Sequence, residues 1–335
     1  MNLANHARLS IAPMMDWTDR HCRYFHRLMS REALLYTEMV TAPALVRGGA
    51  VHLLTHDPSE HPVALQLGGS DAQELAQAAR IGADHGYDEI NLNVGCPSDR
   101  VQSGCFGAVL MERPSLVAEC CAAMIAAQPR DVTVKCRIGV DDQDPADILP
   151  QFIETVAAAG VTRFAIHARK AWLQGLSPKE NRDIPPLDYD LVHAMKRQFP
   201  ALHISVNGGV ETLEQARAFL DAGLDGVMIG RAAYHNPASV LLAADPVIFG
   251  TGSTRSATEI VHDMLPYIDA HLGAGGRLHQ ITRHMLGLFT GRPGARQWRR
   301  ILSEGAHHDG AGTEVVLRAL DAIAPQAHLA GDRNV

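Results

Sequence analysis

The feature that most constrains the fold is a regular alternation of short β-rich runs and helical patterns over the first 240 residues. Several of the β-rich runs are almost continuously apolar, which is typical of parallel strands covered on both faces. Between them lie segments with helical spacing, and one of these ends at Gly223, a residue that favours a helix C-terminus. The predicted strands are 8–15, 34–40, 62–69, 89–95, 131–139, 163–169, 203–209 and 226–232.

Eight strand–helix units of this length predict an α/β protein with a (β/α)8 TIM barrel. The alternative is a doubly wound open sheet, which is weakened because the chain has no GxGxxG motif. After Asp245 a linker follows, and Ser256 and Glu259 have the spacing of a helix capping box. We therefore expect a barrel at 1–245 followed by a C-terminal helical domain at 251–335.

The composition indicates a globular protein of the cytoplasm. Hydrophobic residues make up 46% of the chain and charged residues 20%, and no run approaches the roughly 18 apolar residues of a membrane helix. The N-terminal residues lack the apolar core of a signal peptide. The six cysteines include no CxxC pair and predict reduced thiols. We expect a cytoplasmic location, no membrane partner and no metal.

The charge is distributed unevenly along the chain. The net charge is −7, yet the window from His271 to Ser303 contains six arginines and no acidic residue. This window carries +6, so the rest of the chain carries −13. A basic island on an acidic protein predicts one anionic partner at one place.

Polar residues gather where the predicted strands end. In a barrel of this kind the chemistry lies at the carboxyl ends of the strands. Each residue also has a structural interpretation, since a lysine can reach solvent from an edge and a histidine can be a satisfied core residue. Their shared position at the carboxyl ends of the strands favours a catalytic or binding site. The residues are Gln66, Asn93, Cys96, Lys135, His167, Arg169 and Asn207.

Glycines follow the last two predicted strands. Gly208 and Gly209 end the seventh strand, and Gly230 precedes Arg231 after the eighth. Glycine-rich turns at these places form the usual phosphate site of the barrel, where backbone N–H groups face the anion. The alternative is that these glycines only allow tight turns.

The segment from Asn91 to Cys105, "NLNVGCPSDRVQSGC", contains two cysteines whose role the residues alone leave open. A disulfide, a metal site, a reactive thiol and simple packing are all compatible with it. Cys120 and Cys121 fall in a helical pattern and are interpreted as packing residues.

Several motifs resemble those of the tRNA-dihydrouridine synthases. They are "APMMDWTDRHCRYFHR", "LYTEMV", "ALQLGGSD", "YDEINLNVGCPSDRVQSG", "VKCRIG", "IHAR" and "VNGGV…GVMIGRAAYHNP". Two further segments, "IHARKAWLQGLSPKENRDIPPL" and "RHMLGLFTGRPGARQWRRILSE", resemble the A-type bacterial branch. The resemblance runs from about Leu9 to Glu304.

The resemblance implies an FMN-binding catalytic barrel and a helical tRNA-binding domain, with NADPH as reductant. It implies reduction of uridine at positions 20 and 20a of the tRNA D-loop, with contacts reaching the elbow. A hydride from flavin N5 would go to C6, and Cys96 would be the acid that protonates C5. An ordinary cysteine, with a pKa of about 8.5, is mostly a neutral thiol at pH 7 and can donate a proton. The expected cofactor-binding residues are Pro13, Met14, Met15, Gln66, Lys135, His167, Asn207, Gly208, Gly209, Gly230 and Arg231.

The basic island is the expected tRNA surface. Arg292, Arg296, Arg299 and Arg300 have i, i+4, i+7, i+8 spacing, which is one face of a helix, although a Gly-Pro pair can place Arg292 in the preceding turn. A solvated helix face is the alternative. Two other functions stay open: a flavin barrel acting on a free small molecule, and a tRNA-binding protein without catalysis. The RNA-binding residues implied by the family pattern are Asn93, Lys179, Asn181, Arg182, Arg296 and Arg299.

Overall fold

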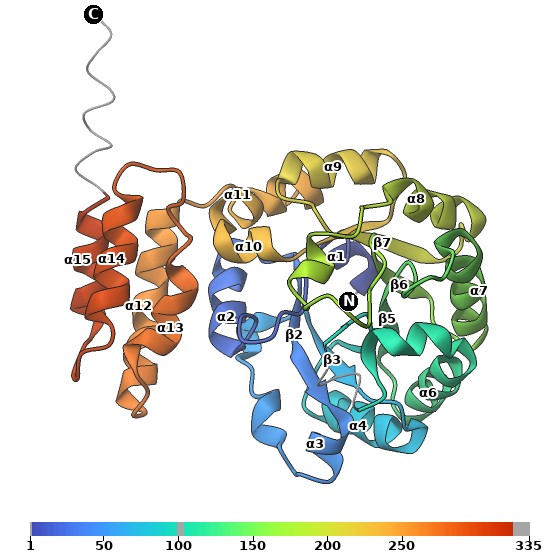
Figure 1. Cartoon of the computed structure of the whole chain (residues 1–335). Helices are drawn as coiled ribbons and strands as arrows, with labels where there is room; N and C mark the ends of the chain where they lie inside the picture. The colour runs from blue at the N-terminus through green and yellow to red at the C-terminus, as the bar shows by residue number, and fades with distance from the viewer. Residues whose placement is uncertain (1, 99–103, 324–335) are drawn as a thin grey trace, which may run out of the picture. The chain divides into compact units, whose positions relative to one another are not determined.

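The computed structural model describes residues 2–98 and 104–323, and its first unit is a closed barrel of parallel strands in the order β1 to β8 (Figure 1). β8 pairs with β1 through Leu9 and Val227, which closes the barrel. The predicted TIM barrel is therefore confirmed, and the open-sheet alternative is wrong. The strands are β1 Leu9–Ile11, β2 Leu34–Thr41, β3 Val63–Gly68, β4 Glu89–Val94, β5 Asp131–Arg137, β6 Arg163–His167, β7 His203–Asn207 and β8 Gly226–Ile229.

Most strands end one to four residues before their predicted ends. The residues beyond these ends lie in loops and bends or, after β8, in the first turn of α10. Gly139 and Gly208, for example, follow β5 and β7 with φ of 154° and 105°. The apolar pattern continues into these segments, so the sequence overestimates the strand lengths.

Helices surround the barrel strands (Figure 1). Their apolar faces are buried, as in α4, where Leu75, Ala78 and Ala79 are buried and the N-cap Asp71 accepts a hydrogen bond from the backbone N–H of Glu74. α4 packs against α6, and α6 packs against α7. The helices of this unit are α1 Leu3–His6, α3 Ala42–Val46, α4 Ala72–Asp84, α6 Pro114–Ala127, α7 Pro145–Ala158, α8 Tyr189–Gln198 and α9 Leu213–Asp221.

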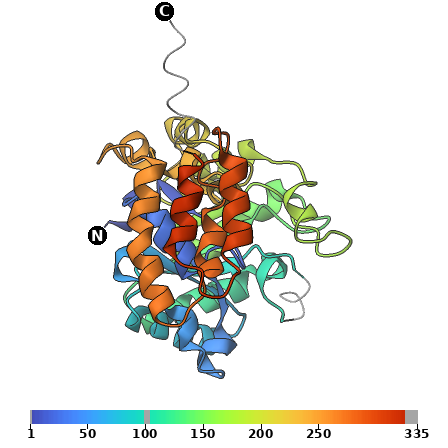
Figure 2. The same cartoon turned by 90° about the vertical axis from the view of Figure 1, so that its left-hand side faces the viewer.

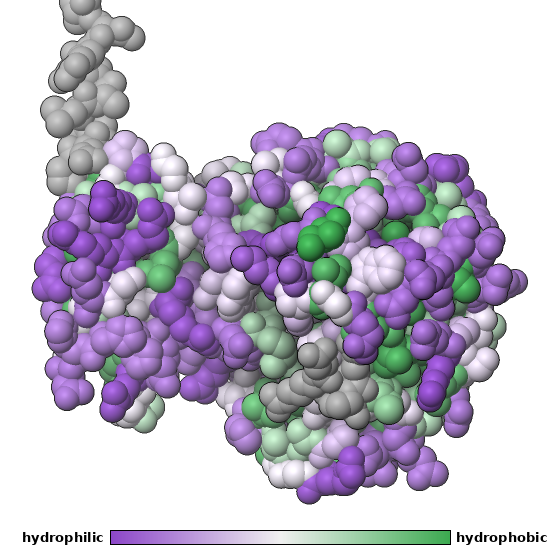
Figure 3. Space-filling view, in the orientation of Figure 1, coloured by the Kyte–Doolittle hydropathy of each residue, from purple (hydrophilic) through white to green (hydrophobic). Residues whose placement is uncertain are grey.

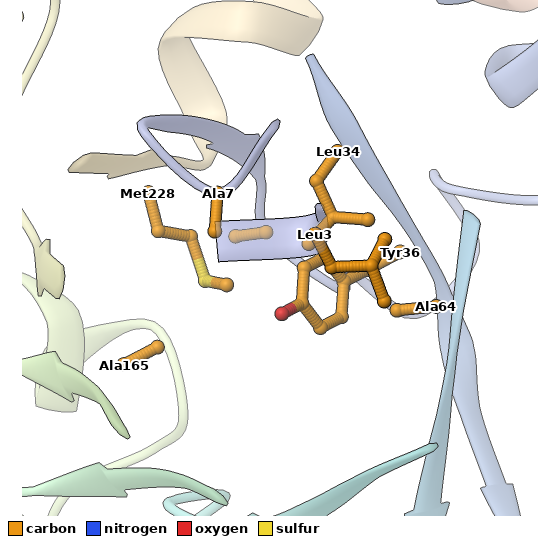
Figure 4. Close-up of a cluster of buried hydrophobic side chains, with 8 residues drawn as sticks. Leu3, Ala7, Leu34, Tyr36, Ala64, Ala165 and Met228 are labelled. Carbon is orange, nitrogen blue, oxygen red and sulfur yellow. The ribbon is translucent and has the colours of Figure 1, made fainter. Parts of the chain in front are cut away.

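The N-terminal segment takes part in the barrel core. Leu3 and Ala7 cluster with Leu34, Tyr36 and Met228, which come from β2 and β8 (Figure 4). All members of this cluster are at most 9% exposed. The segment before β1 is therefore part of the hydrophobic core.

The second unit comprises residues 19–32, 211–213 and 231–335, of which those after 323 lie outside the described residues. Within it α2 packs against α11, α12 and α13, and α14 packs against α13 and α15. Figures 1 and 2 show the long C-terminal helices lying side by side, in orange and red. The predicted C-terminal helices are confirmed. The helices are α2 Arg20–Met29, α10 Arg231–His235, α11 Pro237–Leu241, α12 Ala257–Gly273, α13 Leu278–Met285, α14 Ala295–Gly305 and α15 Thr313–Asp321.

The surface differs between the two units. Figure 3 shows a mostly hydrophilic face over the C-terminal helices, and hydrophobic residues mixed with hydrophilic ones over the barrel. Within residues 2–98 and 104–323, no helix is both long and apolar enough to cross a membrane.

Candidate active site

The carboxyl ends of the barrel strands bring four predicted site residues to one rim. Asn93 lies opposite Lys135 in the β4–β5 register, and His167 lies opposite Asn207 in the β6–β7 register. Lys135 Nζ donates a hydrogen bond of 3.0 Å to Asn207 Oδ1, although β6 lies between their strands. The inward side chains of β5 and β7 therefore meet inside the barrel.

Cys96 lies in a tight turn directly after β4. The side-chain oxygen of Asn93 accepts hydrogen bonds from the backbone N–H of Gly95, at 3.1 Å, and of Cys96, at 3.0 Å. The thiol is half-buried, and its Sγ lies 3.5 Å from Ser98 Oγ. One buried amide therefore fixes the backbone that carries this thiol at the rim.

The six cysteines are free thiols with distinct surroundings. Cys105 is exposed and has a left-handed φ of 55°, whereas Cys120 and Cys121 are buried in α6, as their helical pattern predicted. Burial raises the pKa of Cys120 to about 12, and that of Cys121 further still. Cys96 is thus the cysteine that lies at a strand end with a half-buried thiol.

Lys135 has an altered protonation equilibrium. Burial lowers its pKa to about 8, and the neighbouring Arg137 guanidinium contributes in the same direction. Lys135 lies opposite Asn93, the residue whose side chain fixes the Cys96 turn, so the lysine is close to the candidate thiol. Lys135 is therefore a cation whose charge is readily lost, placed beside the candidate thiol.

His167 is held in its neutral form. Burial lowers its pKa well below the usual value, and the nearby Arg137 and Lys135 lower it further. Its Nδ1 atom is buried and has no hydrogen-bond partner among the described residues. Because buried polar atoms normally have partners, this ring nitrogen points to a bound group that supplies one.

The turn after β7 requires its two glycines. Gly208 and Gly209 have φ values of 105° and 72°, a backbone conformation that favours glycine. A Cβ added at Gly208 would make a tight contact of 3.0 Å with His167 Nε2, and one added at Gly209 would collide with the Tyr189 hydroxyl at 2.5 Å. The Tyr189 hydroxyl donates a hydrogen bond to the Gly208 carbonyl, at 2.7 Å, and so stabilises the turn. Tight turning and an anion site are both compatible with this geometry.

The segment after β1 adjoins the turn after β8. A Cβ added at Gly230 would lie 3.7 Å from Met14 Sδ, which is an ordinary contact, so local packing does not demand glycine there. Arg231 is the next residue and begins α10, in the second unit. Pro13 and Met15 flank Met14, and Met15 is 55% exposed.

The long loop after β6 separates the predicted RNA contacts into two kinds. Lys179 and Arg182 are exposed. Asn181 is fully buried, and its amide bonds Trp172 and the backbone carbonyls of Leu176 and Ser177. Asn181 therefore shapes the loop, and a direct contact with RNA would require the loop to open.

Arg137 is a site residue that the sequence reasoning missed. Its guanidinium donates to the carbonyls of Gly95 at 3.0 Å, of Lys170 at 2.9 Å and of Asn181 at 2.9 Å. It therefore ties the turn of the candidate thiol to the loop after β6. Strand periodicity could have identified it, because Arg137 lies two residues after Lys135 and so points to the same side of β5.

The basic island lies largely on α14, within the second unit. Arg296, Arg299 and Arg300 are exposed, while Trp298 between them is buried and donates its indole N–H to the Met285 carbonyl at 3.0 Å. Arg292 precedes the helix, as the Gly-Pro pair had suggested, and lies over the ring of Phe289. The three helical arginines form no ion pair with any residue in the described part of the chain.

Comparison with known proteins gives consistent results. The family model described as "Dihydrouridine synthase (Dus)" matches residues 10–324. The chain is 61% identical to the tRNA-dihydrouridine(20/20a) synthase of Shewanella oneidensis, over 94% of this chain and 93% of that protein. It is 58% identical to the synthase of the same name from Vibrio cholerae, over 96% and 98%, and 58% identical to that of Escherichia coli K12, over 95% and 92%.

Among solved structures, morphinone reductase aligns with a TM-score of 0.49 and 13% identity, over 76% of this chain and 88% of that one. This similarity is too distant to bear on function.

Proposed function

The chain belongs to the dihydrouridine synthase family, and from this membership we propose that it reduces the 5,6 double bond of uridine in the tRNA D-loop, at positions 20 and 20a. We propose FMN as its cofactor and NADPH as its reductant. Catalysis is assigned to the barrel at 1–245 and tRNA binding to the helical domain at 251–335. The observation that carries the proposal is the Cys96 turn, fixed by Asn93 beside Lys135 and His167 at one rim.

The residues present fit a bound flavin at this rim. The unpartnered Nδ1 of His167 and the cation of Lys135 offer hydrogen-bond and charge complementarity to a bound anionic group. When bound, the flavin would supply the hydride. The residues that would hold it are Pro13, Met14, Met15, Gln66, Lys135, His167, Asn207, Gly208, Gly209, Gly230 and Arg231.

Cys96 is proposed to supply the proton. A thiol held at the rim can donate its Sγ proton to C5 of a uracil ring. Asn93 restricts the turn, and Arg137 holds the Gly95 carbonyl from the other side, so the thiol is kept in one orientation. Fixed geometry of this kind lowers the entropic cost of the proton transfer.

The RNA would be held by charge. A uridine inside folded tRNA must be turned out of its stack to reach a buried site. The exposed arginines of α14 are suited to phosphate contacts, as are Lys179 and Arg182 in the loop after β6. Asn181 would act on the RNA mainly by shaping the loop, since its amide is bonded to protein. Asn93 donates one N–H to Gln66 and has a second one to offer to a base.

The test is reduction of tRNA that lacks dihydrouridine, using purified protein, FMN and NADPH, with the modified positions mapped. The wild type should modify positions 20 and 20a, and Cys96→Ala should be slower by about 10²–10⁴-fold, since it lacks the general acid. The control is Cys105→Asn, because asparagine tolerates the left-handed φ of 55° at that position, and it should keep full activity. An active Cys96→Ala with an inactive Cys105→Asn would contradict the assignment.

A further inference from the structure

A chain of hydrogen bonds runs through the barrel interior from Glu89 towards Cys96. At its lower end the Thr133 hydroxyl donates to Glu89 Oε1, and Asn91 Nδ2 donates to Thr133 Oγ1 at 2.8 Å. The side chains of Glu89 and Asn91 are completely buried, and Thr133 is 3% exposed. These three residues therefore bond to one another, out of contact with solvent.

The chain continues upward through two more amides. Gln66 Nε2 donates to Asn91 Oδ1, and Asn93 Nδ2 donates to Gln66 Oε1, both at 2.8 Å. Asn93 Oδ1 then accepts the backbone N–H of Cys96 at 3.0 Å. Every donor in this chain thus points towards Glu89.

We propose that Glu89 is a positioning residue that sets this direction and thereby the orientation of the Cys96 turn. An ionised carboxylate only accepts hydrogen bonds, so the Thr133 hydroxyl must donate to it. The Thr133 oxygen can then accept from Asn91, which turns the Asn91 carbonyl towards Gln66. The orientation of the Asn91 amide then fixes that of the Gln66 amide, and Gln66 fixes that of Asn93. The inference rests on the proposed function.

The upper end of the chain requires the same direction. The backbone N–H groups of Gly95 and Cys96 can only donate, so Asn93 must present its oxygen to them. Each of the Gln66 and Asn93 NH₂ groups then has one further hydrogen to offer. The site therefore presents N–H donors and favours ligands with carbonyl oxygens, a group that uracil and flavin rings share.

Glu89 is itself strongly held at the barrel floor. Arg163 Nη2 bonds its Oε2 at 2.6 Å, and the Tyr36 hydroxyl bonds its Oε1 at 2.7 Å. The adjacent cavity has a volume of about 10 Å³, which leaves room for at most one water molecule. The carboxylate is therefore the acceptor at the base of the chain, held there by two protein donors in a nearly filled interior.

Substitution of Glu89 by glutamine changes the direction without changing the size of the side chain. The Arg163 guanidinium, a donor, would take the single amide oxygen of the new side chain. The NH₂ group of the new side chain would then donate to the Thr133 oxygen. The Thr133 hydroxyl could in turn donate to Asn91 instead of accepting from it. The amides above would compete between two orientations, and the Cys96 turn would lose its fixed acceptor.

The test compares variants that disrupt the chain with variants that leave it intact. Glu89→Gln removes the acceptor that sets its direction, and Thr133→Val cuts it while keeping the side-chain shape and the Glu89–Arg163 ion pair. Thr133→Ser restores the hydroxyl. Tyr36→Phe removes a hydrogen bond to the same carboxylate but lies outside the chain. If Glu89→Gln does not fold, Thr133→Val decides the question alone.

Two measurements are made on each variant. The first is kcat and KM for reduction of tRNA, where the two chain variants should lose kcat by about tenfold to a hundredfold with a smaller change in KM. The second is the rate at which iodoacetamide alkylates Cys96 in the protein without ligands, read from the tryptic peptide 81–100, in which Cys96 is the one cysteine. This rate should change several-fold in the chain variants, while Cys105, in a different peptide, serves as the internal control.

The outcomes are separable. Thr133→Ser and Tyr36→Phe should match the wild type in both measurements. Unchanged alkylation and kcat in both chain variants would overturn the positioning role, and so would a Tyr36→Phe variant as impaired as Thr133→Val. A wild type that does not reduce tRNA would refute the proposed function, while the alkylation rates would still test Glu89.

Discussion

At the scale of single residues, burial lowers the pKa of Lys135, a change that its position in the sequence does not reveal. The strand pattern correctly predicted that Lys135, His167 and Asn207 lie at strand ends. It could not predict the bond between Lys135 and Asn207, because that contact joins β5 to β7 and exists only once the barrel has closed. The same reason explains why the bonds from Arg137 to three separate carbonyls were not foreseen.

The lowered pKa of Lys135 predicts a pH-dependent affinity for FMN. With a pKa of about 8, Lys135 is charged below that pH and neutral above it. If its cation attracts the anionic cofactor, the affinity of the apoprotein for FMN should fall as the pH rises past about 8. Lys135→Met should bind FMN more weakly at pH 7 and lack this decline. Fluorescence titration with FMN between pH 6.5 and about 9.5 measures the affinity of the wild type and of the variant at each pH. The same pH dependence of affinity in the two proteins would contradict the prediction.

At the scale of secondary-structure elements, local signals were the most reliable. Ser256 and Glu259 form the predicted capping box at the start of α12, since this motif depends only on residues within one turn. The start of α2 was not predicted, although Asp19 caps it by accepting the backbone N–H groups of His21 and Cys22. Asp19 also accepts a hydrogen bond of 2.5 Å from Arg283, a residue distant in the chain that local pattern could not connect with it.

The Asp19 carboxylate should contribute stability that acid removes. Hydrogen bonds and charge from His284 and Arg283 lower its pKa well below the usual value, against the opposing effect of burial. Asp19→Asn keeps an N-cap but loses the charge, so the free energy of unfolding at pH 7 should fall by about 1–3 kcal/mol. A group with a depressed pKa stabilises the fold above the unfolded pKa of about 3.9, so the difference should shrink as the pH falls below about 4.

Urea denaturation at pH 7 and at lower pH measures this difference. The control is Asp269→Asn on α12, whose carboxylate is exposed and should contribute little. A difference that stays constant or grows in acid would show that the charge of Asp19 is not the source of the stability.

At the scale of the whole molecule, the repeated strand–helix pattern was sufficient to predict the barrel, because each unit carries its own apolar signature. The grouping of residues 19–32 and 211–213 with 231–335 could not be predicted from local pattern. It depends on contacts such as those of Asp19 with Arg283 and His284, between segments more than 200 positions apart. The uneven distribution of charge is visible in the sequence and predicted a basic surface. The exposed arginines of α14 provide such a surface.

The last prediction concerns how the proposed functions divide between the barrel and the helical domain. Each arginine that contacts a phosphate releases counterions, so binding weakens as salt rises. Arg296→Ala with Arg299→Ala should weaken tRNA binding and reduce the slope of log affinity against log salt by roughly two units.

Reduction of the bound flavin by NADPH should be unchanged in this variant, because neither arginine belongs to the barrel unit. Turnover at saturating tRNA should fall less than affinity, since phosphate contacts hold ground and transition states alike. Arg197→Ala with Arg217→Ala removes the same charge from exposed positions of α8 and α9 and serves as the control. Because long-range attraction depends on net charge, both variants should share a small loss of affinity, and only the loss of direct contacts should change the salt slope. Equal slopes in the two variants would mean that α14 presents only a solvated face and that the tRNA is held elsewhere.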